Sequence, residues 1–146
     1  MIYRRHKNKY VVESDEYGKH KLYLGVNSEV RDLYPLSGDI FGCVLKVGDN
    51  TIIESIYVKG YCKIGSNCKI GKLEAENYVH IHNHVKIGYW VKLGTGVKIL
   101  PRCTLEDRVE IGGHQSIIGP WVEIPNGTIL MFQTEIRKSP EKWKVY

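Results

Sequence analysis

Apolar and polar residues alternate through the middle of the chain in short triplets that recur at a six-residue period. Each triplet places a polar residue between two apolar ones, which is typical of a β-strand with one buried face. A strand too short to be stable alone, repeated at a fixed period, predicts a solenoid whose core forms by stacking. The clearest triplets are Val79-His80-Ile81, Val85-Lys86-Ile87, Val91-Lys92-Leu93, Val97-Lys98-Ile99, Cys103-Thr104-Leu105, Val109-Glu110-Ile111 and Gln115-Ser116-Ile117.

The same period predicts which residues stack on one another. Three short sides close a triangular coil of about 18 residues, so residues that far apart lie on adjacent coils, about 4.8 Å from each other. This rule pairs Lys92 with Glu110 on the surface. It also places Gln115 at a core position, so Gln115 either leaves the core or needs a buried hydrogen-bond partner. The predicted core columns are Ile81, Ile99 and Ile117; Val85 and Cys103; and Val79, Val97 and Gln115.

The repeat is interrupted at two places. Ile70 and Ile81 are one residue closer together than two full repeats require, so we expect a tightened or rearranged corner within 72–77. Ile117 and Ile124 are one residue further apart than a single repeat allows, with Gly119-Pro120 between them. We expect a bulge or a protruding corner there.

The pattern before residue 40 is different. The segments 10–14 and 19–24 flank Asp15-Glu16-Tyr17-Gly18, which predicts a β-hairpin with a glycine-closed turn. Residues 27–38 are predicted to form a loop, with room for one helical turn after Ser28. We therefore divide the chain into an N-terminal basic arm, hairpin and loop that cap the first coil (1–39), a β-helix (40–130) and a C-terminal basic tail (131–146).

The repeats resemble those of the hexapeptide-repeat proteins. In that family Ile, Leu or Val is followed by Gly and, four positions after the first residue, by a small or β-branched residue. The resemblance covers roughly residues 40 to 130 and implies a left-handed parallel β-helix, although general crossover rules would favour right-handed connections. We therefore expect an all-β, left-handed parallel β-helix of about four to five triangular coils with an N-terminal β-hairpin cap. The matching positions are Ile64-Gly65 with Cys68, Ile87-Gly88 with Val91, and Leu93-Gly94 with Val97.

Composition narrows the class of protein. The 146 residues fit one domain, and they contain no apolar run that could span a bilayer or form a signal peptide. The four cysteines form no CxxC pair, and Cys62, Cys68 and Cys103 fall at inward positions, so we expect free thiols in a reduced, cytoplasmic protein without a structural zinc site. Much of the net charge of +5 comes from basic residues near the two ends of the chain, where solvated tails are expected. Contact of these basic termini with nucleic acid is the less favoured alternative, because no nucleic-acid-binding motif accompanies them.

Histidines are the candidate catalytic residues. His80, His82 and His84 alternate within 78–84, and His114 lies at a corner. In the hexapeptide acyltransferases, which this chain resembles, a corner histidine deprotonates the acceptor at a cleft between subunits, and an acyl-coenzyme A thioester is attacked. Histidine suits this step because its pKa lies near neutral pH. The resemblance implies catalytic roles for His82 and His84, and acetyl-CoA or another acyl-CoA as cofactor, with its phosphates near Lys86, Lys98 and Arg102.

Two other interpretations remain open. Residues 97–105 are similar to a stretch of serine acetyltransferases, but their aspartate–histidine pair and long acceptor loop are missing, which favours a non-catalytic structural or scaffold subunit of a larger assembly. A γ-class carbonic anhydrase is the weaker resemblance. His80 and His114 have nearly the separation that its zinc ligands need, and His82 and His84 could supply a different pair, but Gly119 stands where another histidine is required.

The large aromatic residues suggest self-association. Trp90, Trp121 and Trp143 lie outside the repeat or near its edges, and we expect a homotrimer about an axis along the helix. Trp90 and Arg108 are one predicted coil apart on the same corner, which predicts a cation–π pair or a subunit contact. We interpret this pair as packing.

Overall fold

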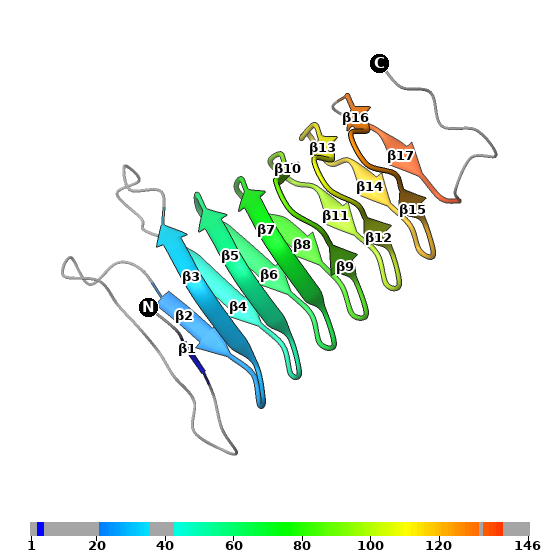
Figure 1. Ribbon diagram of the computed structural model, residues 1–146. Helices are drawn as coiled ribbons and strands as arrows, with labels where there is room; N and C mark the ends of the chain where they lie inside the picture. Colours follow the sequence, from blue (N-terminus) through cyan, green and yellow to red (C-terminus); the bar gives the residue numbers. More distant parts are fainter. Residues whose placement is uncertain (1–2, 5–20, 36–42, 132, 139–146) are drawn as a thin grey trace.

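The computed structural model of the protein is an all-β parallel solenoid of about five turns, with no helix in the part of the chain that it describes (Figure 1). The structure describes residues 3–4, 21–35, 43–131 and 133–138. Nothing within these ranges forms a helix long and apolar enough to cross a membrane. The all-β class and the repeated coils predicted from the six-residue period are confirmed, whereas the left-handed sense and the hairpin cap stay predictions.

One side of every coil contributes a strand to a seven-stranded parallel sheet. Its strands follow one another in chain order along the solenoid axis, because each coil adds one rung beside the previous one (Figure 1). Each strand buries alternate residues in the core, as the triplet pattern predicts. The strands are β2 (Lys21–Leu24), β4 (Val44–Val47), β6 (Tyr61–Ile64), β8 (Val79–Ile81), β11 (Lys98–Ile99), β14 (Ile117–Ile118) and β17 (Glu135–Ile136).

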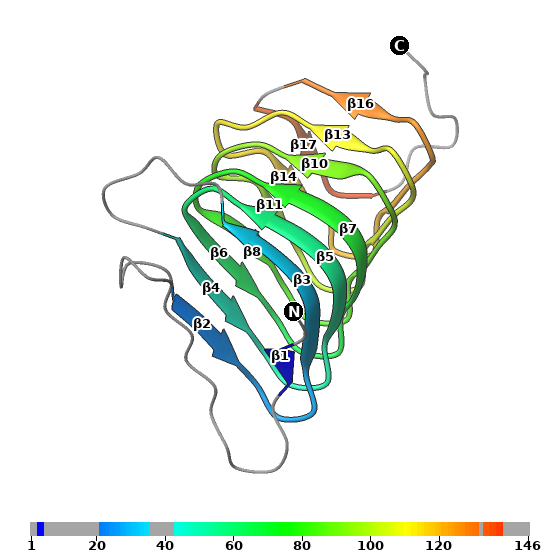
Figure 2. The ribbon, with the colours of Figure 1, turned by 60° about the vertical axis from the view of Figure 1, so that its left-hand side comes forward.

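The other two sides of the coils form a ten-stranded sheet. In its first three coils one long strand covers both sides, and in later coils two short strands separated by a corner replace it (Figure 2). The long strands are β3 (Glu29–Pro35), β5 (Ile52–Val58) and β7 (Lys69–Ala75), and β1 (Tyr3–Arg4) pairs antiparallel with β3. The short strands are β9 (Lys86–Ile87), β12 (Thr104–Leu105) and β15 (Glu123–Ile124) on one side, and β10 (Val91–Leu93), β13 (Glu110–Ile111) and β16 (Ile129–Leu130) on the other.

The predicted inward and outward positions of the central coils are confirmed. Lys86, Lys92 and Lys98 are exposed, and the predicted pair between the Lys92 ammonium and the Glu110 carboxylate is present at 3.7 Å. The four cysteines are buried free thiols. The core positions predicted to point inward are between 0% and 4% exposed: Ile81, Ile87, Leu93, Ile99, Leu105 and Ile111.

The length of a coil is not constant along the chain. In one column of the seven-stranded sheet Lys63 pairs with His80 and His80 pairs with Lys98, so the second step is one residue longer than the first. The difference arises in β7, where Gly71 and Lys72 cross a corner that on the next coil comprises Gly88, Tyr89 and Trp90. The tightened corner predicted within 72–77 is therefore present, but it begins at Gly71 and most of the predicted segment is strand.

A further residue is added between β13 and β14. Lys98 pairs with Ile117, a step one residue longer again, so Ile118 and not Ile117 stacks on Ile99. The predicted columns that contain Ile117 and Gln115 are thus wrong. Gln115 leaves the core for the corner at 112–115, and Ser116 takes its place, fully buried, with its hydroxyl donating to the Gly112 carbonyl at 2.7 Å.

The extra residue fits because two consecutive corner residues, His114 and Gln115, adopt left-handed backbone conformations with φ of 57° and 67°. The interruption was predicted one corner too late. Residues 119–121 form a corner of ordinary length between Ile118 and Val122, both of which are buried.

The segment before residue 40 differs from the prediction. Residues 29–35 form β3, which pairs in parallel with β5, and not a loop with a helical turn. Residues 21–24, predicted as part of a hairpin strand, form β2 and pair in parallel with β4 as a rung of the solenoid. Residues 5–20, which hold the rest of the predicted hairpin, lie outside the described residues.

Candidate functional site

The predicted site residues are distributed over two sheets and the corner between them. His82 follows β8, and Lys98 lies in β11 on the next coil of the same seven-stranded sheet. Lys86 lies in β9 of the ten-stranded sheet. His84 and Arg102 occupy equivalent positions on the intervening corner, both with left-handed backbone (φ 59° and 64°). The structure thus brings His82 and Lys98 to one face and separates them from Lys86.

His82 forms a stacked pair with His80. The two ring centroids are 4.1 Å apart, with an angle of 22° between the planes. The stack is held by the strand ladder, since the backbone N–H groups of His80 and His82 donate to the carbonyls of Val97 and Ile99 at 3.0 and 2.8 Å. The pair therefore has a fixed position on the outer surface of the seven-stranded sheet.

The surroundings of these histidines disfavour their charged forms. Burial is the largest cause that lowers the pKa of His80, to about 4, and the positive charge of His82, Lys63 and Lys98 adds to it. Burial and the same two lysines also lower the pKa of His82. Both imidazoles are therefore neutral at neutral pH, and each can accept a proton or a hydrogen bond from a ligand.

A column of basic residues runs through this pair along the solenoid axis. Lys46 is in register with Lys63, Lys63 with His80, and His80 with Lys98, each at the outward centre of its triplet. Neighbouring rungs of a sheet are about 4.8 Å apart, so these side chains form a closely spaced line of basic groups. We call these four residues, Lys46, Lys63, His80 and Lys98, the basic ladder.

Aromatic rings accompany the basic ladder. The Lys46 ammonium lies 5.7 Å from the centroid of the Tyr23 ring and 5.6 Å from that of Tyr61. The Tyr61 ring in turn lies 6.3 Å from Tyr78, which is 67% exposed. Cations over aromatic faces are attracted by the ring quadrupole, which helps to hold Lys46 in place.

Carboxylates are missing from this part of the sheet. The strands β2, β4, β6, β8, β11 and β14, all within the described residues, contain no aspartate or glutamate. The first acidic strand residue along the sheet is Glu135 in β17, and its carboxylate accepts a 2.7 Å hydrogen bond from the Arg137 guanidinium. The basic ladder therefore presents positive charge without acidic neighbours on its own strands.

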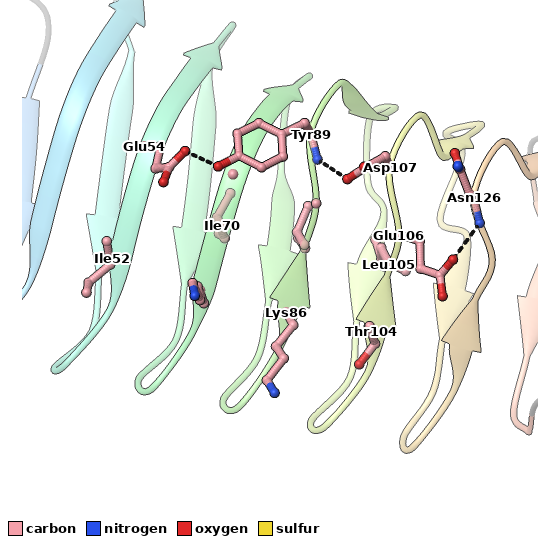
Figure 3. A pocket seen from close by; sticks show the side chains of 14 residues that line it. Ile52, Glu54, Ile70, Lys86, Tyr89, Thr104, Leu105, Glu106, Asp107 and Asn126 are labelled. Atoms are coloured by element: carbon pink, nitrogen blue, oxygen red, sulfur yellow. Dashed lines mark hydrogen bonds between the residues drawn. The ribbon is translucent and has the colours of Figure 1, made fainter.

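Lys86 lies in a different environment. It lines a groove of about 400 Å³ on the ten-stranded sheet (Figure 3), whose lining also includes Gly71 and Gly88. Tyr89 crosses this groove, with its hydroxyl donating to Glu54 and its backbone N–H to Asp107 Oδ1 at 2.8 Å. Because carboxylates line the same groove, Lys86 is less suited than Lys98 to hold phosphates.

The tryptophan contacts on the corners differ from the prediction. The cation over the Trp90 ring is the Lys72 ammonium, 3.7 Å from the centroid, and not Arg108. Arg102 lies over Trp121, with its guanidinium carbon 5.1 Å from the ring centroid. Both tryptophans are more than half exposed, so neither belongs to the core of this chain.

Metal ligands do not gather in the described part of the chain. No group of three or more His, Cys, Asp or Glu side chains there is placed to hold a metal ion. A scan against models of known protein families finds no match, and a search among curated proteins finds no similar sequence. The fold and site define a parallel β-solenoid with a basic, tyrosine-flanked face.

The basic ladder was not identified from the sequence, although a signal was present. Its members are the central residues of four triplets, 45–47, 62–64, 79–81 and 97–99. The fixed coil length assumed from the repeat does not align Lys46, Lys63 and His80, because the coils that join them are one residue shorter. A search that allowed either spacing would have found the column.

Proposed function

We propose that this protein is a non-catalytic binding scaffold whose seven-stranded sheet holds a linear polyanion along the basic ladder. The observation that carries the proposal is the line of Lys46, Lys63, His80 and Lys98, with no acidic residue on the strands β2 to β14 of that sheet. The three lysines of this row are cations, and the neutral His80 between Lys63 and Lys98 can donate or accept a hydrogen bond. A rigid row of this kind attracts a flexible polyanion because binding releases the counterions of the polymer.

The cost of the basic ladder supports the proposal. Like charges placed opposite each other on neighbouring strands destabilise a sheet. The ladder keeps three lysines in one column, against the two, Lys69 and Lys86, that are in register on the ten-stranded sheet. A bound polyanion would remove this repulsion. The rigid β-solenoid would supply the alignment without any rearrangement, which lowers the entropic cost of binding.

The test is binding of medium-length inorganic polyphosphate, measured by isothermal titration calorimetry at several salt concentrations. A triple variant of the ladder lysines, Lys46→Ala, Lys63→Ala and Lys98→Ala, should lose most of the affinity and much of its salt dependence. The matched control is Lys69→Ala, Lys86→Ala and Lys92→Ala, which removes the same charge from exposed positions of the ten-stranded sheet. Equal losses in both variants would show that only net charge matters and would contradict the proposal.

The second candidate is a coenzyme A-dependent acyltransferase that uses a histidine base at a subunit interface. Its support is the neutral His82 beside Lys98 on one exposed face, where the imidazole can accept a proton and the lysine can meet a phosphate. The homotrimer and the cytoplasmic location belong to this candidate as further proposals.

Acetyl-CoA distinguishes the two candidates. An acyltransferase should be stabilised by about 2.7 kcal/mol at a hundredfold excess of acetyl-CoA over its dissociation constant. His82→Ala and His84→Ala should keep this thermal shift, since they remove proton transfer and leave the phosphate contacts. No shift at millimolar acetyl-CoA, or a monomer mass by light scattering, would remove an active site built between subunits.

A further inference from the structure

We propose that the polyanion is a single-stranded nucleic acid, an inference that rests on the binding-scaffold function proposed above. The basic ladder supplies cations for phosphates, and the tyrosines beside it supply flat apolar surfaces for bases. A cationic groove with aromatic side chains is the common design of proteins that bind single strands without strong sequence preference.

The tyrosines lie where bases would need them. Tyr61 precedes the ladder residue Lys63 by two positions on β6, so both side chains point outward from the same rung. Tyr78 lies two positions before His80 and extends the same column on the next coil, with its ring 6.3 Å from that of Tyr61. Each of these two rungs therefore presents one ring and one basic group side by side.

The fold does not account for the exposed aromatic side chain of Tyr78. It is 67% exposed, and its ring approaches that of Tyr61 in a tilted arrangement without entering the core. Its backbone is left-handed, with φ of 57°, a conformation that asparagine and glycine adopt more easily than tyrosine. The equivalent corner position on the next coil is Gly96, so the solenoid does not require a ring there.

Other polyanions use this surface less fully. Inorganic polyphosphate and sulfated polysaccharides carry the charge but have no planar bases, so they leave the rings of Tyr61 and Tyr78 unused. A duplex keeps the faces of its bases stacked inside, so these two rings have no base to stack on. A single strand is the polyanion that engages both the cations and the rings.

The experiment compares four probes by fluorescence anisotropy: labelled oligo(dT), labelled oligo(rU), a labelled duplex of the same length, and unlabelled inorganic polyphosphate as competitor. We expect the single strands to bind more tightly than the duplex. Tyr78→Ala should weaken oligo(dT) binding roughly tenfold, because one stacked base is lost, and should leave polyphosphate binding unchanged. Tyr78→Phe should retain oligo(dT) binding, since the ring is kept.

Controls separate stacking from folding and charge. Tyr34→Ala removes a ring that is 43% exposed on the ten-stranded sheet and should leave oligo(dT) binding unchanged. If Tyr78→Ala lowers the melting temperature, Tyr78→Asn removes the ring with a residue that suits the left-handed backbone. The triple ladder variant should lower the slope of log affinity against log salt by about two for oligo(dT).

The outcomes distinguish this inference from the function on which it rests. Ladder-dependent binding of polyphosphate without binding of oligo(dT) would overturn the nucleic acid and keep the polyanion scaffold. The same conclusion would follow if Tyr78→Ala weakened neither ligand, or if the duplex bound as tightly as the single strands. Failure of both polyphosphate and oligo(dT) to bind would overturn the scaffold function itself.

Discussion

The two sheets of this solenoid share the same coils and the same core, but their outer charges are arranged differently. On the ten-stranded sheet, Lys92 pairs with Glu110 at 3.7 Å, and Arg31 lies 3.6 Å from Glu29 on the same strand. On the seven-stranded sheet, Lys63 lies between Lys46 and His80, and Lys46 lies between two tyrosine rings. The ten-stranded sheet thus combines a paired Lys92 and Glu110 with one column of two lysines, Lys69 and Lys86, whereas the seven-stranded sheet has three lysines in one column without a carboxylate between them.

The difference separates the positions that stability requires to be apolar from those whose residue type it leaves open. Stacking requires an apolar residue on either side of each central triplet position, and both sheets meet that requirement. The central position itself faces solvent, so the fold leaves its charge free. On the seven-stranded sheet these positions hold like charges, which costs some stability. We favour ligand binding as the explanation of this arrangement.

The largest expected effect concerns the core that both sheets share. Ile118→Asp should unfold the protein, because it buries an unpaired charge and costs about 4 kcal/mol or more. Ile117→Asp, at the preceding position, places the same charge on the half-exposed outer face and should change the melting temperature little. Thermal denaturation followed by circular dichroism checks both, and the reverse result would restore the register with Ile117 inside.

A smaller change in stability, which involves the seven-stranded sheet alone, is expected at low pH. The folded state lowers the pKa of His80 to about 4, so the unfolded chain binds this proton more readily. Stability should therefore fall as pH decreases from about 6.5 towards 4 and should be insensitive to this group above that window. His80 is only partly buried, so solvent screening limits the loss to about 1 kcal/mol.

Urea denaturation at a series of pH values measures this loss. His80→Gln should flatten the decrease below pH 6.5. Lys98→Met should narrow the window, because it removes a neighbouring charge that helps to lower the pKa of His80. His82 and Lys63 also face this imidazole, so a variant at either should act in the same direction. An unchanged pH profile in His80→Gln would assign the acid sensitivity to other groups.

A comparable or smaller effect should appear when the seven-stranded sheet is given the charge pattern of the ten-stranded one. Lys63→Glu places a carboxylate beside Lys46 and should raise stability by about 0.5 kcal/mol, since repulsion becomes attraction. The same change should weaken polyphosphate binding strongly, because it places a negative charge in the middle of the ladder. A gain in stability with loss of binding is the trade-off expected of a functional surface. Binding that survived Lys63→Glu would remove this lysine from the site.

The smallest effect is expected for the ion pair of the ten-stranded sheet. A double-mutant cycle with Lys92→Ala and Glu110→Ala should give a coupling energy of a few tenths of a kcal/mol that decreases with salt, because both side chains are about half exposed. Chemical denaturation at low and high salt measures it. A coupling above about 1 kcal/mol would show that paired charges contribute more to this sheet than exposed pairs usually do.

The fold could be predicted from the sequence wherever the apolar positions were unambiguous. From Ile81 to Ile111 each triplet has one possible register, and every inward residue was assigned correctly. Ile117 and Ile118 are both apolar, so the sequence could not decide which faces the core, and the extra residue of the 112–115 corner remained hidden. The strand β3 was missed because Asp32 and Leu33 interrupt the alternation that Glu29 begins.

The candidate site was less accessible to sequence reasoning. The histidine pattern pointed to His82 and His84, whereas the ring that stacks on His82 is that of His80. The predicted phosphate contacts grouped Lys86 with Lys98, although a corner places them on different sheets. In a solenoid, the residues that act together on one face come from successive coils. Their alignment therefore depends on the exact length of each coil.

The change in coil length also bears on how such a chain can be extended. Each coil contacts mainly the coils on either side of it, so duplication of a segment one coil long adds a rung without disturbing the others. The step from Cys62 to its partner Val79, among the first coils, is one residue shorter than the step from Lys86 to Thr104 in the middle. A duplicate of the wrong length would turn every later apolar residue out of register. Coil length changes at Gly71-Lys72 and again at the 112–115 corner, so a duplicated segment has to match the length of the coils beside it.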